Sequence, residues 1–178
     1  MGLLHEAGLA HVYDQDIHGL NPLLERMSQW GMPVNEAARV RAAEGLTAQC
    51  QGLLGQIRAL VPEAVCRKKV YKKKPTQVLP FVPSPTQVVT YLKSVGIKVP
   101  QRDGRDTTEE TALRRLALRH PADPVLPLVL YYREVEKDRQ FVEGLKPVAD
   151  GAVHTTFTHD PSTLRLSSKQ PNLQNVPR

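Results

Sequence analysis

The residues that could hold a metal or act as a nucleophile are scattered through this sequence. Asp14 and Asp16 could share one face of a strand, and paired carboxylates can hold two metal ions. They stand at the entry to a predicted helix, however, where a favourable charge at the helix start is the alternative. The six histidines form no HxH or HExxH pattern, and Cys50 and Cys66 lack CxxC spacing. We therefore predict no catalytic residue and no metal site within these residues.

One segment concentrates positive charge. Residues 67–74 contain six basic and no acidic side chains. They account for the net charge of +6, since the whole chain has 24 Lys and Arg against 18 Asp and Glu. A local block of cations predicts contact with a polyanion at one place, and a solvated loop without a partner is the alternative. The block consists of Arg67, Lys68, Lys69, Lys72, Lys73 and Lys74.

Planar hydrogen-bonding groups gather near the end of the sequence. Residues 167–178 are polar, rich in Asn and interrupted by Pro, which predicts an irregular segment. Amide and guanidinium groups suit the minor-groove acceptors that every correctly paired duplex offers. The alternative is a set of polar turn residues that are satisfied within the protein. The side chains concerned are Arg165, Asn172, Gln174 and Asn175.

Long helices are the main elements expected to position these residues. Apolar residues recur at helical spacing over 17–30, from the capping residue Asn35 to about residue 60, and over 124–145. Two shorter helices are predicted after the capping boxes that begin at Ser84 and Thr107. Between the long helix that ends near residue 60 and the capping box at Ser84, helical periodicity disappears over 63–83, which predicts a loop or a reaching arm.

Beyond Gly151 the apolar period changes from 3.6 to 2. Val153, Thr155 and Phe157 alternate with polar residues, which predicts a strand. A turn and a short second strand, Thr163 to Leu166, are expected to follow. The predicted fold is therefore mainly α with a small β portion (α+β). It consists of a helical body followed by the opening hairpin of a sheet.

Three motifs stand in the last quarter of the sequence: His154-Thr155-Thr156-Phe157, Leu164-Arg165-Leu166-Ser167-Ser168 and Pro171-Asn172-Leu173-Gln174-Asn175-Val176-Pro177. Together they resemble family A DNA polymerases of the bacterial DNA polymerase I type. The resemblance extends back through Tyr132-Arg133-Glu134, Thr107-Thr108-Glu109-Glu110, the segment Phe81 to Pro100, and Leu24-Glu25-Arg26-Met27.

This resemblance implies a thumb and the first part of a palm. The expected division is the tail of a preceding exonuclease-like region (1–16), a palm entry helix (17–35), the thumb (36–148) and the start of the palm sheet (149–178). The implied function is that of a DNA-directed DNA polymerase, a nucleotidyltransferase. This part would grip primer–template DNA during deoxynucleotide addition. The alternative is a non-catalytic DNA-binding or accessory protein derived from a polymerase thumb.

The resemblance also implies roles for individual residues. Arg165, Asn172, Gln174 and Asn175 match positions that hold the duplex near the primer end. Arg133 and Lys137 are i, i+4 neighbours on a face expected opposite the apolar stripe, where they could reach phosphates. Thr107 and Thr108 match a phosphate-binding turn, although Glu109 replaces a small hydroxyl residue there. The basic block, Arg67 to Lys74, falls at the tip of the thumb, where the family varies.

The family's metal-holding carboxylates lie beyond residue 178, so we expect this chain to bind no cofactor and to be inactive alone. Mg²⁺ is expected in the complete polymerase, together with the remaining palm and fingers portion as a partner. A deliberately shortened protein, a split polymerase and an interrupted precursor all stay open. No apolar run approaches the ~20 residues that span a bilayer, and no signal peptide is recognised. We expect the cytoplasm of a bacterial or phage-infected cell, with an organelle as the alternative.

Overall fold

The structure is a computed structural model of the 178-residue chain. It describes Gly8, 10–12, Asp14, and residues 18–69, 77–159 and 166–175. The chain divides into two compact units. The first unit joins Met1–Ala43 to Gln140–Arg178, and the second is the continuous segment Glu44–Arg139. Helices make up most of the regular structure in the described ranges and the strands are short, so the predicted mainly-α fold with a small β portion is confirmed.

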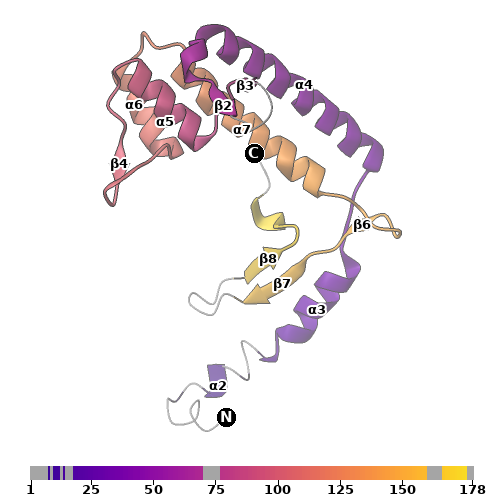
Figure 1. Cartoon of the computed structure of the whole chain (residues 1–178). Coiled ribbons are helices and arrows are strands. Elements are labelled where there is room, and N and C mark those ends of the chain that lie inside the picture. Colours follow the sequence, from indigo (N-terminus) through magenta and orange to yellow (C-terminus); the bar gives the residue numbers. More distant parts are fainter. Residues whose placement is uncertain are drawn as a thin grey trace. The chain divides into compact units, whose positions relative to one another are not determined.

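The first unit holds a few short elements and two small sheets. They are α2 (Ala10–Val12), α3 (Asn21–Trp30), β1 (Met32–Pro33), β6 (Ala152–Val153), β7 (Thr156–His159), β8 (Leu166–Lys169) and η3 (Leu173–Asn175). β1 pairs with β6 in antiparallel fashion, with Met32 opposite Val153. β7 pairs with β8, with Phe157 opposite Ser168, and the hairpin continues into η3 (Figure 1).

Helix α3 is shorter than its apolar periodicity predicted. It begins at Asn21 rather than at residue 17. The reason lies in Pro22, which has no N–H to donate and is therefore tolerated only in the first turn of a helix. At the other end Gly31 stops the helix with a positive φ of 65°, a conformation that glycine adopts without steric cost.

The second unit is a helical body around one main apolar core. Its helices are α4 (Glu36–Leu60), which begins in the first unit, α5 (Pro85–Ser94), α6 (Glu110–Arg119) and α7 (Val125–Gly144), with the 3-10 turn η2 (Glu63–Val65). The core is formed by fully buried side chains from these helices and from the segment before α5, including Ile57, Phe81, Leu92, Leu113 and Leu126.

Local capping explains where three of these helices start. The Asn35 side chain accepts the N–H of Ala38 at 3.0 Å at the start of α4. Ser84 accepts the N–H of Gln87 at 3.4 Å ahead of α5. Asp123 does the same for α7, a cap that the sequence analysis missed. Each contact satisfies a helix N–H that has no intrahelical partner.

The capping box predicted for α6 is wrong. Thr107 accepts the N–H of Glu109 at 3.3 Å, only two residues on, and Glu109 occupies the cap position without a side-chain bond. The Glu110 carboxylate is bound instead by Arg114 at 2.8 Å. An i, i+4 ion pair on the helix surface therefore replaces the expected contact with the backbone.

Two short hairpins lie between the helices of the second unit. β2 (Arg67–Lys69) pairs with β3 (Gln77–Leu79) inside the expected reaching arm. β4 (Gln101–Arg102) pairs with β5 (Arg105–Asp106) across Asp103 and Gly104, both of which have positive φ. An Asp-Gly pair of this kind favours a tight hairpin turn. Of the expected second strand at 163–166, only Leu166 is described, and it begins β8 (Leu166–Lys169); residues 160–165 lie outside the described part.

In the described residues no helix combines the length and the apolar character needed to cross a membrane.

Candidate nucleic-acid interface

The segment after β8 in the first unit, residues 170–175, is held in one shape by two buried hydroxyls. Ser168, only 2 % exposed, accepts the N–H of Leu173 at 2.9 Å and donates to the Asn172 side chain at 3.2 Å. Thr155, 4 % exposed, has its hydroxyl oxygen 2.9 Å from the Lys169 carbonyl oxygen and 2.7 Å from the Pro171 carbonyl oxygen, and its single hydrogen is shared between these two acceptors. Both side chains turn away from solvent, so their role is to fix the backbone.

Two of the predicted minor-groove residues are exposed on this fixed segment. The Asn172 side-chain oxygen accepts the N–H of Gln174 at 3.0 Å. The Gln174 amide donates one hydrogen to the Leu166 carbonyl at 2.7 Å. Each side chain therefore uses one atom to shape the segment. The Asn172 amide nitrogen and the Gln174 amide oxygen have no partner among the described residues.

The other two predicted minor-groove residues are described only in part. Arg165 lies outside the described residues. The backbone of Asn175 belongs to η3, but its side chain also lies outside the described part. Their predicted contacts with DNA stay predictions.

In the second unit, Arg133 does not lie on a solvated face opposite the apolar stripe, as was predicted. It is half-buried, and burial lowers the pKa of its guanidinium. Its Nε and Nη2 atoms donate to the Pro83 carbonyl at 3.3 and 3.2 Å. Nη1 donates to the Thr108 carbonyl at 2.5 Å, and Nη2 to the Thr108 hydroxyl at 3.3 Å. The guanidinium thus ties α7 to the segments ahead of α5 and α6, because its fork of donors can meet several carbonyls at once.

Thr108 is therefore also displaced from its predicted role. Its side chain is 7 % exposed and its hydroxyl accepts from Arg133. Little of its surface is open to a phosphate in this conformation, and the predicted contact stays a prediction. Lys137, one helical turn beyond Arg133, is exposed and makes no hydrogen bond or ion pair with any described residue. Of the predicted pair on α7, Lys137 keeps the geometry needed to reach a phosphate.

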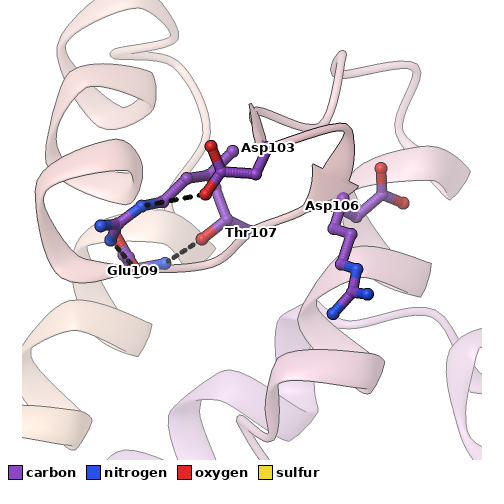
Figure 2. Close-up of a pocket in the computed structure, with 6 residues that line it drawn as sticks. Asp103, Asp106, Thr107 and Glu109 are labelled. Carbon is purple, nitrogen blue, oxygen red and sulfur yellow. Dashed lines mark hydrogen bonds and ion pairs between the residues drawn. The ribbon is translucent and has the colours of Figure 1, made fainter.

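Thr107 lies in a hollow between the β4–β5 hairpin and the start of α6 (Figure 2). Arg102 binds the Glu109 carboxylate there at 2.6 Å. Lys93 binds Asp106 at 2.8 Å, and this contact lowers the pKa of Asp106. The carboxylates are thus largely neutralised by neighbouring cations. The hollow is lined by Arg102, Asp103, Arg105, Asp106, Thr107 and Glu109.

Sequence analysis missed this hollow, although the Asp-Gly turn flanked by two arginines signalled a hairpin that would present them. Two cations facing three carboxylates give no net attraction for a phosphate. A phosphate at Thr107 would have to compete with the Glu109 carboxylate for the Arg102 guanidinium. Thr107 is therefore a weaker candidate than Lys137 for a contact with a DNA phosphate.

The predicted basic block is only partly described. The backbone of Arg67, Lys68 and Lys69 forms β2, but their side chains lie outside the described part, as do Lys72, Lys73 and Lys74 altogether. No three His, Cys, Asp or Glu side chains come together as metal ligands within the ranges that the structure describes.

Comparison with known proteins shows which family the chain resembles in sequence. Residues 64–178 match the family model described as DNA polymerase family A. The chain is 34% identical over 148 residues to DNA polymerase I of Mycobacterium leprae (strain TN), which covers 80% of this chain and 15% of that protein. It is 40% identical over 75 residues to DNA polymerase I of Treponema pallidum (strain Nichols), covering 40% of this chain and 7% of the relative. The chain therefore spans only a small part of the length of these relatives.

A solved structure shares the fold. The chain aligns with the "POL domain of Pol1 from M. smegmatis complex with DNA primer-template and dNTP" at a TM-score of 0.67 and 24% identity, over 97% of this chain and 31% of that one. The family match covers well over half of the sequence, and the motifs of the last quarter lie inside it. The chain belongs to DNA polymerase family A.

Proposed function

We propose that this chain grips primer–template duplex as part of a DNA-directed DNA polymerase. The observation that carries the proposal is the fixed segment after β8. Buried Ser168 and Thr155 hold its backbone, while the Asn172 and Gln174 amides lie exposed on it. A rigid scaffold with exposed polar groups binds a ligand at a lower entropic cost than a mobile loop would.

The chemistry of these amides suits a duplex of any sequence. The minor groove offers acceptors at equivalent places in A·T and T·A pairs, and G·C pairs add one donor. The Asn172 amide nitrogen can donate to such acceptors, and the Gln174 oxygen can accept from a guanine amino group. The polymerase domain from M. smegmatis was solved with DNA primer-template and dNTP, which supports this assignment.

Phosphate contacts would come from cations elsewhere in the chain. Lys137 is the best-placed candidate on α7, because it is exposed and unpaired among the described residues. The basic block 67–74 adds sequence-independent attraction for a polyanion. Arg133 supports binding indirectly, by tying α7, which carries Lys137, to the segments ahead of α5 and α6.

We assign the thumb to 36–148 and the flanking palm pieces to 17–35 and 149–178. The division of the chain into one continuous and one discontinuous unit supports this assignment, although the unit boundaries fall at 44 and 139. The remaining palm and fingers portion would be supplied by the same precursor or by a second chain. We place the Mg²⁺ site on that portion as well, as the resemblance to the family implies.

The test is binding of the 178-residue chain to a primer–template duplex. Replacing Gln174 with Ala should weaken binding about two- to tenfold, the effect of losing one hydrogen bond of ~0.5–1.5 kcal/mol. Gln29→Ala is the matched control, since Gln29 is an exposed amide in the same unit with no partner among the described residues. Equal effects of the two substitutions, with both variants folded, would show that the segment after β8 does not meet DNA.

A further inference from the structure

Both ring nitrogens of His154 face hydrogen-bond acceptors. Nδ1 lies 2.9 Å from the Ser28 carbonyl oxygen, and Nε2 lies 2.8 Å from the Asp150 carboxylate. A carbonyl oxygen can only accept, so Nδ1 must carry a hydrogen. An ionised carboxylate also only accepts, so Nε2 must carry one as well. The geometry therefore selects the doubly protonated, positively charged imidazolium.

The place of this cation in the fold favours its charge. Ser28 lies in the last turn of α3, where carbonyl groups lack intrahelical partners and the helix dipole is negative. The bond to Ser28 and the Asp150 carboxylate raise the pKa of His154 above its ordinary value. The N–H of Ala152 and the imidazole in turn lower the pKa of Asp150.

The backbone around the ring leaves it little freedom. A Cβ atom on Gly31 would stand 2.9 Å from the Cε1 atom of His154 and 3.0 Å from the Val153 carbonyl. The ring thus lies directly against the residue that ends α3. Three residues after His154, the N–H of Phe157 donates to the Ser28 hydroxyl at 3.3 Å. Contacts from α3 therefore reach both His154 and the start of the β7–β8 hairpin.

Asp150 is the only charged group bonded to the imidazole among the described residues. The other titratable groups on the surrounding elements make no hydrogen bond or ion pair with it in the described part. They are Glu25 and Arg26 on α3, Lys146 ahead of Asp150 and Lys169 on β8; the side chain of His159 on β7 lies outside that part.

We propose that His154 is a pH-sensitive clasp: as an imidazolium between Ser28 and Asp150, it positions the β7–β8 hairpin, and the segment that follows it, against the end of α3. The clasp forms only when His154 is protonated and Asp150 is ionised. Its contribution to stability is present between the lowered pKa of Asp150 and the raised pKa of His154. It is lost as the pH rises from the ordinary pKa of an unfolded histidine through the raised pKa of folded His154, because over that range the folded chain binds more protons than the unfolded chain.

The first test is an NMR titration of the histidine ring protons in the full chain. The His154 midpoint should lie above the ordinary value of about 6.5. Asp150→Asn should lower it below the wild-type midpoint. Asn keeps the oxygen that accepts the N–H of Ala152, but it presents an NH₂ group that a neutral Nε2 can accept. An ordinary midpoint, or one unchanged by Asp150→Asn, would overturn the clasp.

The second test follows urea unfolding through the fluorescence of Trp30, the only tryptophan in the sequence. Trp30 ends α3, so its signal reports on the first unit. The wild-type midpoint should fall as the pH rises from about 6.5 through the raised pKa of folded His154, and His154→Gln should flatten this fall. The control is His120→Gln, which removes an exposed histidine in the second unit. Parallel profiles of wild type and His154→Gln would refute the clasp, and both tests use the free chain, so neither depends on DNA binding.

Discussion

The guanidinium of Arg133 joins three segments of the second unit through hydrogen bonds to the Pro83 and Thr108 carbonyls. Removing it leaves the acceptors of these buried residues without their donor, and hydrogen bonds to charged groups contribute about 1.5–3 kcal/mol each. Arg133→Met should therefore lower the free energy of unfolding by roughly 2–3 kcal/mol. Arg133→Lys should recover only part of this loss, because an ammonium cannot span both carbonyls as the planar fork does.

Urea unfolding measures this effect, with Arg115→Met as the matched control. Arg115 is exposed on α6 and has no partner among the described residues, so its loss should change stability by no more than ~0.5 kcal/mol. If Arg133→Met left stability unchanged and weakened duplex binding instead, Arg133 would be a phosphate contact as first predicted from the sequence.

At the scale of elements, one carboxylate connects the start of α7 to α5. Asp123 Oδ1 accepts the N–H groups of Val125 and Leu126 at 2.8 and 3.1 Å. Its Oδ2 accepts the Tyr91 hydroxyl at 2.9 Å. Burial of the phenol and the neighbouring Asp123 carboxylate raise the pKa of Tyr91.

Asp123→Ala should cost more than loss of the tyrosine contact alone. A helix cap contributes ~0.5–2 kcal/mol, and the buried hydroxyl left without a partner adds ~1 kcal/mol or more. Tyr91→Phe removes only the hydrogen bond between Tyr91 and Asp123 and leaves no hydroxyl unpaired, so it should cost less. Asp123→Asn should retain much of the contribution of the cap. The measurement is the urea midpoint of the three variants. Equal losses in Asp123→Ala and Tyr91→Phe would contradict the cap.

The helices were predictable because their signals are local. Asn35 and Ser84 lie within three residues of the N–H groups that they cap, so a short stretch of sequence contains the whole interaction. The β2–β3 and β7–β8 hairpins were harder, because strand pairing depends on residues across a turn. Arg133 could not be placed from sequence, since its partners lie 25 and 50 residues away. The exposed face expected for it follows from helix periodicity alone, which ignores such distant carbonyls.

The candidate site was predictable to a similar degree. Asn172 and Gln174 were singled out by residue type and by resemblance, and both are exposed on a shaped segment. Their second task, shaping that segment through Ser168 and Leu166, was not visible in the sequence. Small polar residues such as Ser168 look alike whether buried or solvated, and only the fold distinguishes the two.

At the scale of the whole molecule, the chain covers a limited part of a polymerase: 31% of the matched M. smegmatis chain and 15% of the M. leprae relative. Gripping a duplex and catalysing nucleotide addition can therefore be separated by experiment. The 178-residue chain should bind primer–template duplex in a salt-dependent manner. Replacing Lys72, Lys73 and Lys74 with Ala should lower the slope of log affinity against log salt by about 2 to 3 if all three meet phosphates.

Primer extension in the presence of Mg²⁺ should give no product with the chain alone, because we place the metal-holding carboxylates on the remaining palm and fingers portion. Two-metal catalysis requires such carboxylates to hold both ions at the reacting oxygens. Mixing the chain with that portion of a family A polymerase should produce extension, and a heat-denatured chain serves as the control. Mg²⁺-dependent extension by the chain alone, above that control, would contradict the placement of the metal-holding carboxylates on the remaining portion. If the chain binds duplex tightly but never restores extension in the mixture, the non-catalytic DNA-binding alternative is favoured. Duplex binding would then not be coupled to nucleotide addition.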